Sequence, residues 1–123
     1  MRAKAAVCAI ALLAIATNAN AEGMTAGQLT TACLTDSSES QALCIGYFRG
    51  FFEGLQTARL LGSLRLAQTG LNVDVPKEFC PADDATADEM MNVAVAYILN
   101  KPEMFGDQPH AIIIAAWKNA FPC

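Results

Sequence analysis

The sequence predicts an all-α protein, a small bundle of four main helices that disulfides staple together. Two observations predict this fold class. At three places a serine or threonine precedes a glutamine or glutamate by three residues, which is the capping-box pattern of a helix start. Four cysteines remain once an expected export signal is removed, and small exported domains commonly rely on disulfides.

Residues 1–21 have the pattern of a cleaved export signal. Two basic residues precede an apolar run, and Ala19-Asn20-Ala21 has the small-x-small pattern of a cleavage site. The run is shorter than the roughly 20 apolar residues that a membrane span needs, and no later stretch is long and apolar enough. We therefore expect an exported protein whose single mature domain covers residues 22–123.

The four remaining cysteines are even in number and widely spaced. In an exported chain this count predicts two disulfides, with three connectivities open. A zinc site is the alternative, but no C-x-x-C pair occurs and the chain has one histidine. The cysteines concerned are Cys33, Cys44, Cys80 and Cys123.

The mature chain is acidic. The signal contains two of the eight basic residues and none of the twelve acidic ones. Six basic and twelve acidic residues remain, so the net charge of the mature chain is −6. Such a surface repels nucleic acid and favours a basic partner, although solubility alone also accounts for it.

The first two capping boxes define a short helix and a long one. Thr25 to Gln28 opens a helix predicted over residues 26–34, and Ser38 to Gln41 opens a central helix over residues 39–68. At 100° per residue the central helix has a broad apolar face and a narrow polar strip opposite. The apolar face holds Cys44, Tyr47, Phe48, Phe51, Phe52 and Leu55, and the strip holds Arg49, Glu53 and Gln56.

A ridge of small residues follows the central helix at every fourth position. Each glycine costs roughly 1 kcal/mol of helix propensity against alanine, so tight packing has to offset several of them. Two interpretations stay open: neighbouring helices of the same chain wrap around a crowded core helix, or the ridge meets a second copy. The ridge consists of Gly46, Gly50, Gly54, Ala58 and Gly62.

A connector without helical periodicity covers residues 69–85. Leu71, Val73 and Val75 alternate with polar residues in it, which fits a short strand or an extended arm. Thr86 to Glu89, the third capping box, then opens a helix that runs to about residue 100, followed by a short turn at 101–105.

The last helix is expected to end near Ala120. Its predicted N-cap is Asp107, with Pro109 at the second helical position. A helical hairpin brings Cys33 near Cys44, and antiparallel packing of the last two helices brings Cys80 near Cys123, so these pairings are preferred.

Catalytic motifs are absent from the sequence, which has no zincin motif, phosphate loop, nucleophile elbow or dinucleotide fingerprint. We expect a surface or capping role for His110, the single histidine, and no free thiol to serve as a nucleophile. Four carboxylates resemble a metal or acid–base cluster. Their position at a helix start, where acidic residues are favourable, is the simpler reason for their presence. They are Asp83, Asp84, Asp88 and Glu89, and we expect neither an enzyme nor a cofactor or metal site.

An ordered set of short motifs resembles the Rap/Tai family of immunity proteins, which accompany peptidoglycan amidase effectors of type VI secretion systems. The set covers nearly the whole mature chain. It comprises C-x-G-Y-x-x-G from Cys44 to Gly50, F-C-P from Phe79, Y-x-L from Tyr97, Pro102-Glu103, and A-F-P-C from Ala120.

The resemblance implies a small helical periplasmic protein, usually a homodimer. It would bind a cysteine–histidine amidase and occupy its active cleft, so the chemistry would belong to the amidase. Residues 66–78 match no signature of the family, so contact residues are not carried over.

From length, irregularity and charge we expect the contact surface in the connector and the aspartates beside it. Two rival functions are an acid-stress periplasmic chaperone and an inhibitor of lysozyme-like glycosidases. The expected contact residues are Thr69, Gly70, Asn72, Asp74, Lys77, Asp83, Asp84 and Asp88.

Overall fold

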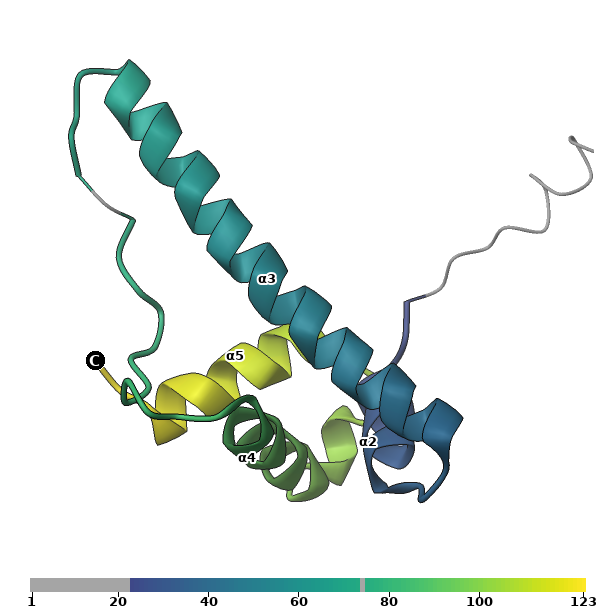
Figure 1. Ribbon diagram of the computed structural model, residues 1–123. Coiled ribbons are helices and arrows are strands. Elements are labelled where there is room, and N and C mark those ends of the chain that lie inside the picture. Colours follow the sequence, from purple (N-terminus) through teal and green to yellow (C-terminus); the bar gives the residue numbers. More distant parts are fainter. Residues whose placement is uncertain (1–22, 74) are drawn as a thin grey trace, which may run out of the picture.

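The computed structural model describes residues 23–73 and 75–123, which form four α-helices and one 3-10 turn (Figure 1). The all-α prediction is confirmed, and the described residues contain no strand. Within the same ranges, no helix has the length and apolar character that crossing a membrane requires. The expected signal, residues 1–21, lies outside the described part. The elements are α2 (Ala26–Leu34), α3 (Ser38–Gln68), α4 (Ala87–Leu99), η1 (Pro102–Met104) and α5 (Pro109–Ala120).

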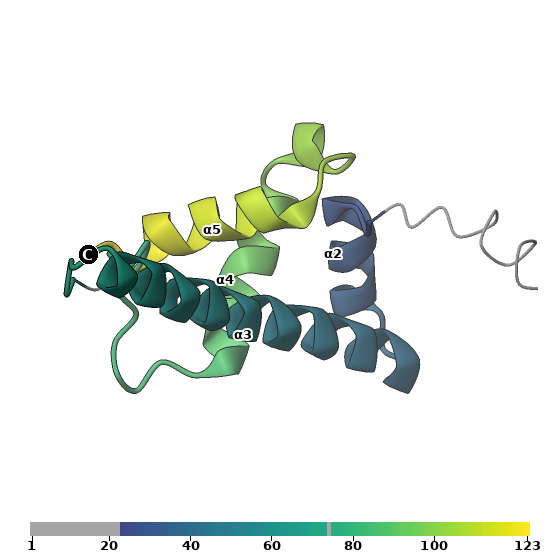
Figure 2. The same cartoon turned by 90° about the horizontal axis from the view of Figure 1, so that it is seen from above.

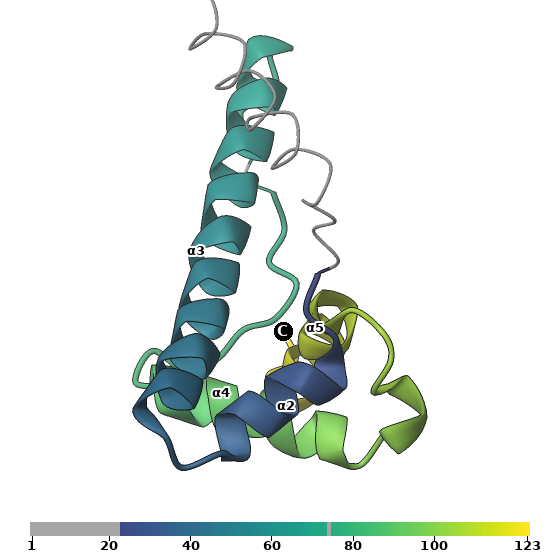
Figure 3. The same cartoon turned by 90° about the vertical axis from the view of Figure 1, so that its right-hand side faces the viewer.

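Helices α2, α4 and α5 gather around the N-terminal half of α3 and form the body of the protein (Figures 1 and 2). The C-terminal end of α3 projects from this body, and the connector returns from its tip (Figure 3). We call residues 60–73 the arm. Most of its large apolar side chains are exposed, namely Leu60, Leu61, Leu64, Leu71 and Val73, whereas Leu66 is half-buried.

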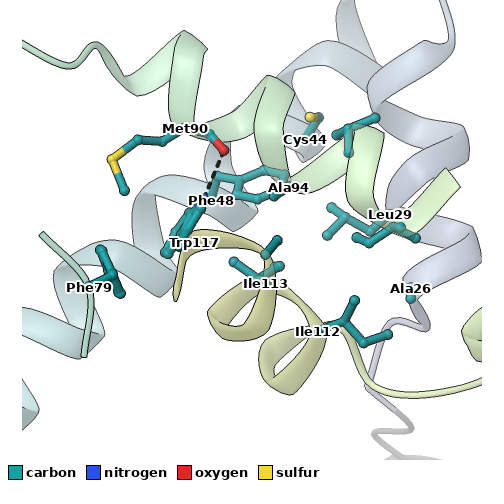
Figure 4. Packing of buried hydrophobic residues seen from close by; sticks show 13 residues of the cluster. Ala26, Leu29, Cys44, Phe48, Phe79, Met90, Ala94, Ile112, Ile113 and Trp117 are labelled. Carbon is teal, nitrogen blue, oxygen red and sulfur yellow. Dashed lines mark hydrogen bonds between the residues drawn. The ribbon is translucent and has the colours of Figure 1, made fainter. Parts of the chain in front are cut away.

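The core lies between the four helices and is built from the apolar faces that helical periodicity indicates (Figure 4). Trp117 is the largest fully buried side chain. The apolar face of α3 points inward as predicted: Cys44 and Phe48 are buried, and the other members pack against the core. The inward residues predicted for α5 are all buried: Ile112, Ile113, Ala116 and Trp117.

Two predicted helix starts have the expected caps. The hydroxyl of Thr25 accepts a hydrogen bond from the Gln28 amide over 3.2 Å, and the Gln28 side chain accepts one from the Thr25 amide over 2.9 Å. Thr86 caps α4 by accepting from the Glu89 amide over 3.1 Å. These bonds satisfy main-chain donors that have no partner inside the helix.

The other two helix starts differ from the prediction. Helix α3 is capped by Ser37, whose hydroxyl accepts from the Ser40 amide, so Ser38 is the first helical residue and not the cap. Helix α5 begins at Pro109 after Gln108, so Asp107 is not the N-cap. The Asp107 carbonyl instead accepts a hydrogen bond from the Ala26 amide over 2.8 Å at the start of α2.

The two disulfides join the preferred pairs, Cys33–Cys44 and Cys80–Cys123. The first closes the hairpin of α2 and α3, where the Gln41 amide group also donates to the Cys33 carbonyl over 3.2 Å. The second ties the connector to the residues that follow α5. Both ends of the connector are therefore fixed, one by α3 and the other by this disulfide.

The connector is extended and not a strand. It returns along α3, where the Val75 amide donates to the Ser63 hydroxyl over 3.2 Å. A β-carbon on Gly62 would lie 2.7 Å from the Val75 side chain, so glycine is what allows this approach.

Candidate interaction surface

A groove of about 530 Å³ runs between α3 and the start of α4. Its floor is apolar and includes Phe48, Met90 and Trp117, all of which are buried. Its remaining lining residues come from α3, from α4 and from the connector just before α4: Ile45, Arg49, Phe52, Glu53, Gln56, Ala85, Ala87, Asp88 and Met91.

The floor is well packed because Trp117 makes one hydrogen bond and several aromatic contacts. Its indole nitrogen donates a hydrogen bond to the Met90 carbonyl over 2.8 Å (Figure 4). The rings of Phe51 and Phe79 have centroids 5.7 and 5.1 Å from its own, and two more phenylalanines lie just beyond. Such aromatic contacts add to the stabilisation from burial itself.

The rim of the groove is charged. Arg49 and Glu53 form an exposed ion pair over 3.2 Å on the α3 side, and Asp88 lies in the first turn of α4 on the other side. The charges of Arg49 and Glu53 cancel each other. Asp88, in contrast, has no charged partner among the salt bridges of the described residues. The polar strip predicted on α3 is therefore the outer wall of this groove.

The carboxylates before and in the first turn of α4 are exposed: Asp83, Asp84, Asp88 and Glu89. Asp88 and Glu89 interact favourably with the positive end of the helix dipole. In the described part of the chain no three histidine, cysteine or acidic side chains are grouped so as to hold a metal ion. Asp88 lines the groove and the other three are its close neighbours in the chain, so we call the four residues the acidic border of the groove.

The predicted contact residues do not form one surface. Thr69, Gly70 and Asn72 lie at the tip of the arm, whereas Asp83, Asp84 and Asp88 lie beside the body where α4 begins (Figure 1). Lys77 lies between them in the connector, and Asp74 falls outside the described residues. At the tip, Gly70 has a φ of 85°, which glycine adopts without strain.

The small ridge of α3 is mostly uncovered. Of the residues with described positions, none comes within 4 Å of a β-carbon built on Gly46, Gly50 or Gly54, and Ala58 is exposed. Packing within the chain occurs only at Gly62. Within the described residues, no neighbouring helix therefore packs against the first three glycines of the ridge.

The histidine and the cysteines that were considered as catalytic residues do not form a catalytic site in the described residues. His110 lies in the first turn of α5 and is exposed. All four cysteines between residues 23 and 123 are in disulfides, so this part of the chain offers no thiol nucleophile. The groove itself was missed by sequence analysis; the aromatic run Phe48, Phe51 and Phe52 was its one local signal.

Comparison with known proteins gives one match. The family model described as Rap1a immunity proteins matches residues 25–123, which span all four helices and both disulfides. Neither a curated protein nor a solved structure matches this chain.

Proposed function

Because this chain belongs to the Rap1a immunity protein family, we propose that it protects its producer and sibling cells from a type VI secretion effector. The effector would be a peptidoglycan amidase of the cysteine–histidine type, and the protein would block its active cleft by binding. We place this event in the periplasm, after removal of residues 1–21. Two disulfides in a small domain support an exported protein.

The observation that carries the proposal is the groove between α3 and α4. A well-packed apolar floor with an acidic border suits a partner segment that carries an apolar side chain next to a lysine or arginine. The floor supplies burial, and the carboxylates supply orientation and a faster encounter. With six basic residues against twelve acidic ones after signal removal, the whole chain attracts a basic surface.

The tip of the arm is a second candidate for the contact. It includes Thr69, Gly70 and Asn72, which are exposed, and it projects from the body of the protein (Figure 3). A projecting loop can insert into a cleft of the partner, whereas the groove can bind a segment of the partner. The two surfaces predict different sensitive variants, so one set of measurements separates them.

The first test measures protection. An exported cysteine–histidine amidase, taken from the reading frame beside this one, should lyse cells, and co-export of this protein should rescue them. Lysis that continues despite export of the folded protein overturns the proposal of amidase immunity for that pair.

The second test measures affinity by titration calorimetry with purified amidase. Reversing the charge of Asp83, Asp84 and Asp88 to lysine should weaken binding about tenfold or more and speed dissociation. The matched control reverses three exposed carboxylates elsewhere, Asp36, Glu39 and Glu103. Equal affinity for the two triple variants removes the groove border from the contact, and loss of affinity on replacing the tip residues by alanine assigns the contact to the arm.

We also propose that the protein is a homodimer. The exposed apolar side chains of α3 support this proposal, because monomeric soluble proteins rarely expose large contiguous apolar patches.

A further inference from the structure

The tip of the arm is open to an enzyme. All seven residues from Ala67 to Val73 are exposed, and the tip projects from the body of the protein (Figure 3). Leu71 lies just after the turn that ends α3, outside any helix, and its side chain is 54% exposed. Exposed loop tips are the places where endoproteases cut folded proteins most readily.

Leu71 fits one class of endoprotease. Chymotrypsin-type serine endoproteases hold a large apolar side chain in a hydrophobic slot and cut the peptide bond that follows it. The bond after Leu71 ends at the Asn72 amide, which donates no hydrogen bond to another described residue. The other strongly exposed leucines of the arm lie within α3, where helical hydrogen bonds hold the backbone: Leu60, Leu61 and Leu64. Leu71 is therefore the leucine of the arm that such an enzyme can reach.

The two disulfides lie on opposite sides of the tip in the sequence. Cys33 and Cys44 both precede it, and Cys80 and Cys123 both follow it. No disulfide among the described residues therefore spans the tip. One cut there would separate the chain into two halves, the first with α2 and α3 and the second with α4 and α5, and each half would be closed by its own disulfide.

The core joins these two halves without contacts from the arm. The Trp117 ring of the second half has its centroid 6.4 Å from that of Phe48 and 5.7 Å from that of Phe51 in the first half. The Ala26 amide at the start of α2 donates a hydrogen bond to the Asp107 carbonyl of the second half over 2.8 Å. Because these contacts lie in the body, the halves should stay folded together after the chain is cut.

From these observations we propose that the tip is a modification site: a chymotrypsin-type endoprotease cuts after Leu71 and leaves a folded protein of two chains. The reaction is a hydrolysis. The bond between the Leu71 carbonyl carbon and the Asn72 nitrogen breaks, the carbon gains the hydroxyl of one water, and the nitrogen gains the remaining proton of that water. The products are a new carboxyl group at Leu71 and a new amino group at Asn72, and nothing is oxidised or reduced.

The cut would act on one of the two candidate contact surfaces. It divides the tip, whereas the residues that line the groove all lie before residue 57 or after residue 84. Cleavage therefore changes the tip and leaves the groove in place. The consequence for immunity rests on the function proposed above, while the site and its two-chain product do not.

The test is limited digestion of the oxidised mature protein with chymotrypsin. Mass spectrometry should show a first pair of fragments, one ending at Leu71 and one beginning at Asn72, and the pair should separate on a denaturing gel without reductant. Before denaturation the two fragments should elute together in gel filtration. A first cut elsewhere, or fragments that elute apart under native conditions, would overturn the proposal.

Trp117 reports whether the body survives the cut. It is the single tryptophan of the chain, it is 1% exposed, and it lines the groove. In the two-chain form its fluorescence should keep the emission wavelength of a buried indole, and far-ultraviolet circular dichroism should show that the helices are retained. A shift to the emission of an exposed indole would show that the body has unfolded and would overturn the two-chain product.

A matched pair of variants tests the choice of bond. Leu71→Ser should slow the first cut at least about tenfold, because the slot of the enzyme loses its apolar partner. Leu34→Ser is the control and should be cut at the wild-type rate, since Leu34 is 61% exposed but is the last residue of α2. Equal rates for Leu71→Ser and the wild type would overturn the assignment of the bond. If neither the intact nor the cut protein binds an amidase, the proposed amidase target is overturned and this inference stands.

Discussion

The indole nitrogen of Trp117 donates a hydrogen bond to the main-chain carbonyl of Met90 over 2.8 Å, and Trp117 is only 1% exposed. This bond joins the last helix to the first turn of α4. Both residues line the groove, so the bond helps to hold the start of α4 against the groove floor. A buried indole nitrogen normally finds a partner, and here the partner is fixed by the fold.

Trp117→Phe should therefore destabilise the protein by about 2 kcal/mol or more, since it loses both a buried hydrogen bond and packed volume. Unfolding by guanidinium, followed by far-ultraviolet circular dichroism, measures the change. Asn119→Ala on the exposed side of the same helix is the control and should stay within about 0.5 kcal/mol. A Trp117→Phe variant as stable as the control would show that the indole contributes little to the free energy of unfolding.

The two disulfides should differ in how readily they are reduced. Cys80 and Cys123 are both exposed, whereas Cys44 of the other pair is fully buried. Mild dithiol treatment of the folded protein should open Cys80–Cys123 first, and alkylation followed by peptide mass spectrometry identifies the released thiols. Reduction of Cys33–Cys44 first would contradict this order.

Losing either disulfide should also cost stability, by different amounts. The loop closed by Cys80–Cys123 has a sequence separation of 43, against 11 for Cys33–Cys44. Constraint of the unfolded chain then contributes roughly 4 and 3 kcal/mol respectively. Replacing each pair by alanines and comparing the free energies of unfolding tests this difference.

The helices could be predicted from the sequence because their signals are local. Thr25 with Gln28, and Thr86 with Glu89, are cap pairs that act within one helical turn. The inward residues of α5 follow from a period of 3.6 residues. Hairpin geometry then favoured the cysteine pairs seen in the structure.

The groove and the uncovered small ridge of α3 could not be predicted in the same way. A helical wheel finds Gly50 and Gly54 on one side of α3, but only the tertiary arrangement decides whether that side is covered. Arg49 and Glu53 line the groove from α3 and Asp88 lines it from α4, and how two helices far apart in the sequence pack is not encoded in a short pattern. For the same reason Asp107 was mistaken for a cap, although its carbonyl is used by α2.

Tyr47 should make folding stability fall at alkaline pH. Burial raises the pKa of the Tyr47 hydroxyl above its ordinary value of 10.0, so the folded protein favours the neutral phenol. This contribution is fully present below the pKa of the unfolded chain and is lost as the pH rises through the folded pKa. Tyr47→Phe should flatten the decrease in unfolding free energy above about pH 10. An unchanged slope in Tyr47→Phe would contradict the assignment.

The structure and the sequence pattern assign the N-cap of α3 to different serines, Ser37 and Ser38 respectively. Ser37 has an extended backbone, with φ −138° and ψ 150°, and its hydroxyl accepts from the Ser40 amide over 3.2 Å. Ser38 is already helical, so its hydroxyl is not placed to cap the first turn. Ser37→Ala should therefore cost about 1 kcal/mol of unfolding free energy, whereas Ser38→Ala should be neutral or slightly stabilising, because alanine favours a helix. Urea unfolding of the two variants beside the wild type measures both values, and a larger loss in Ser38→Ala than in Ser37→Ala would restore the cap that the sequence pattern indicates.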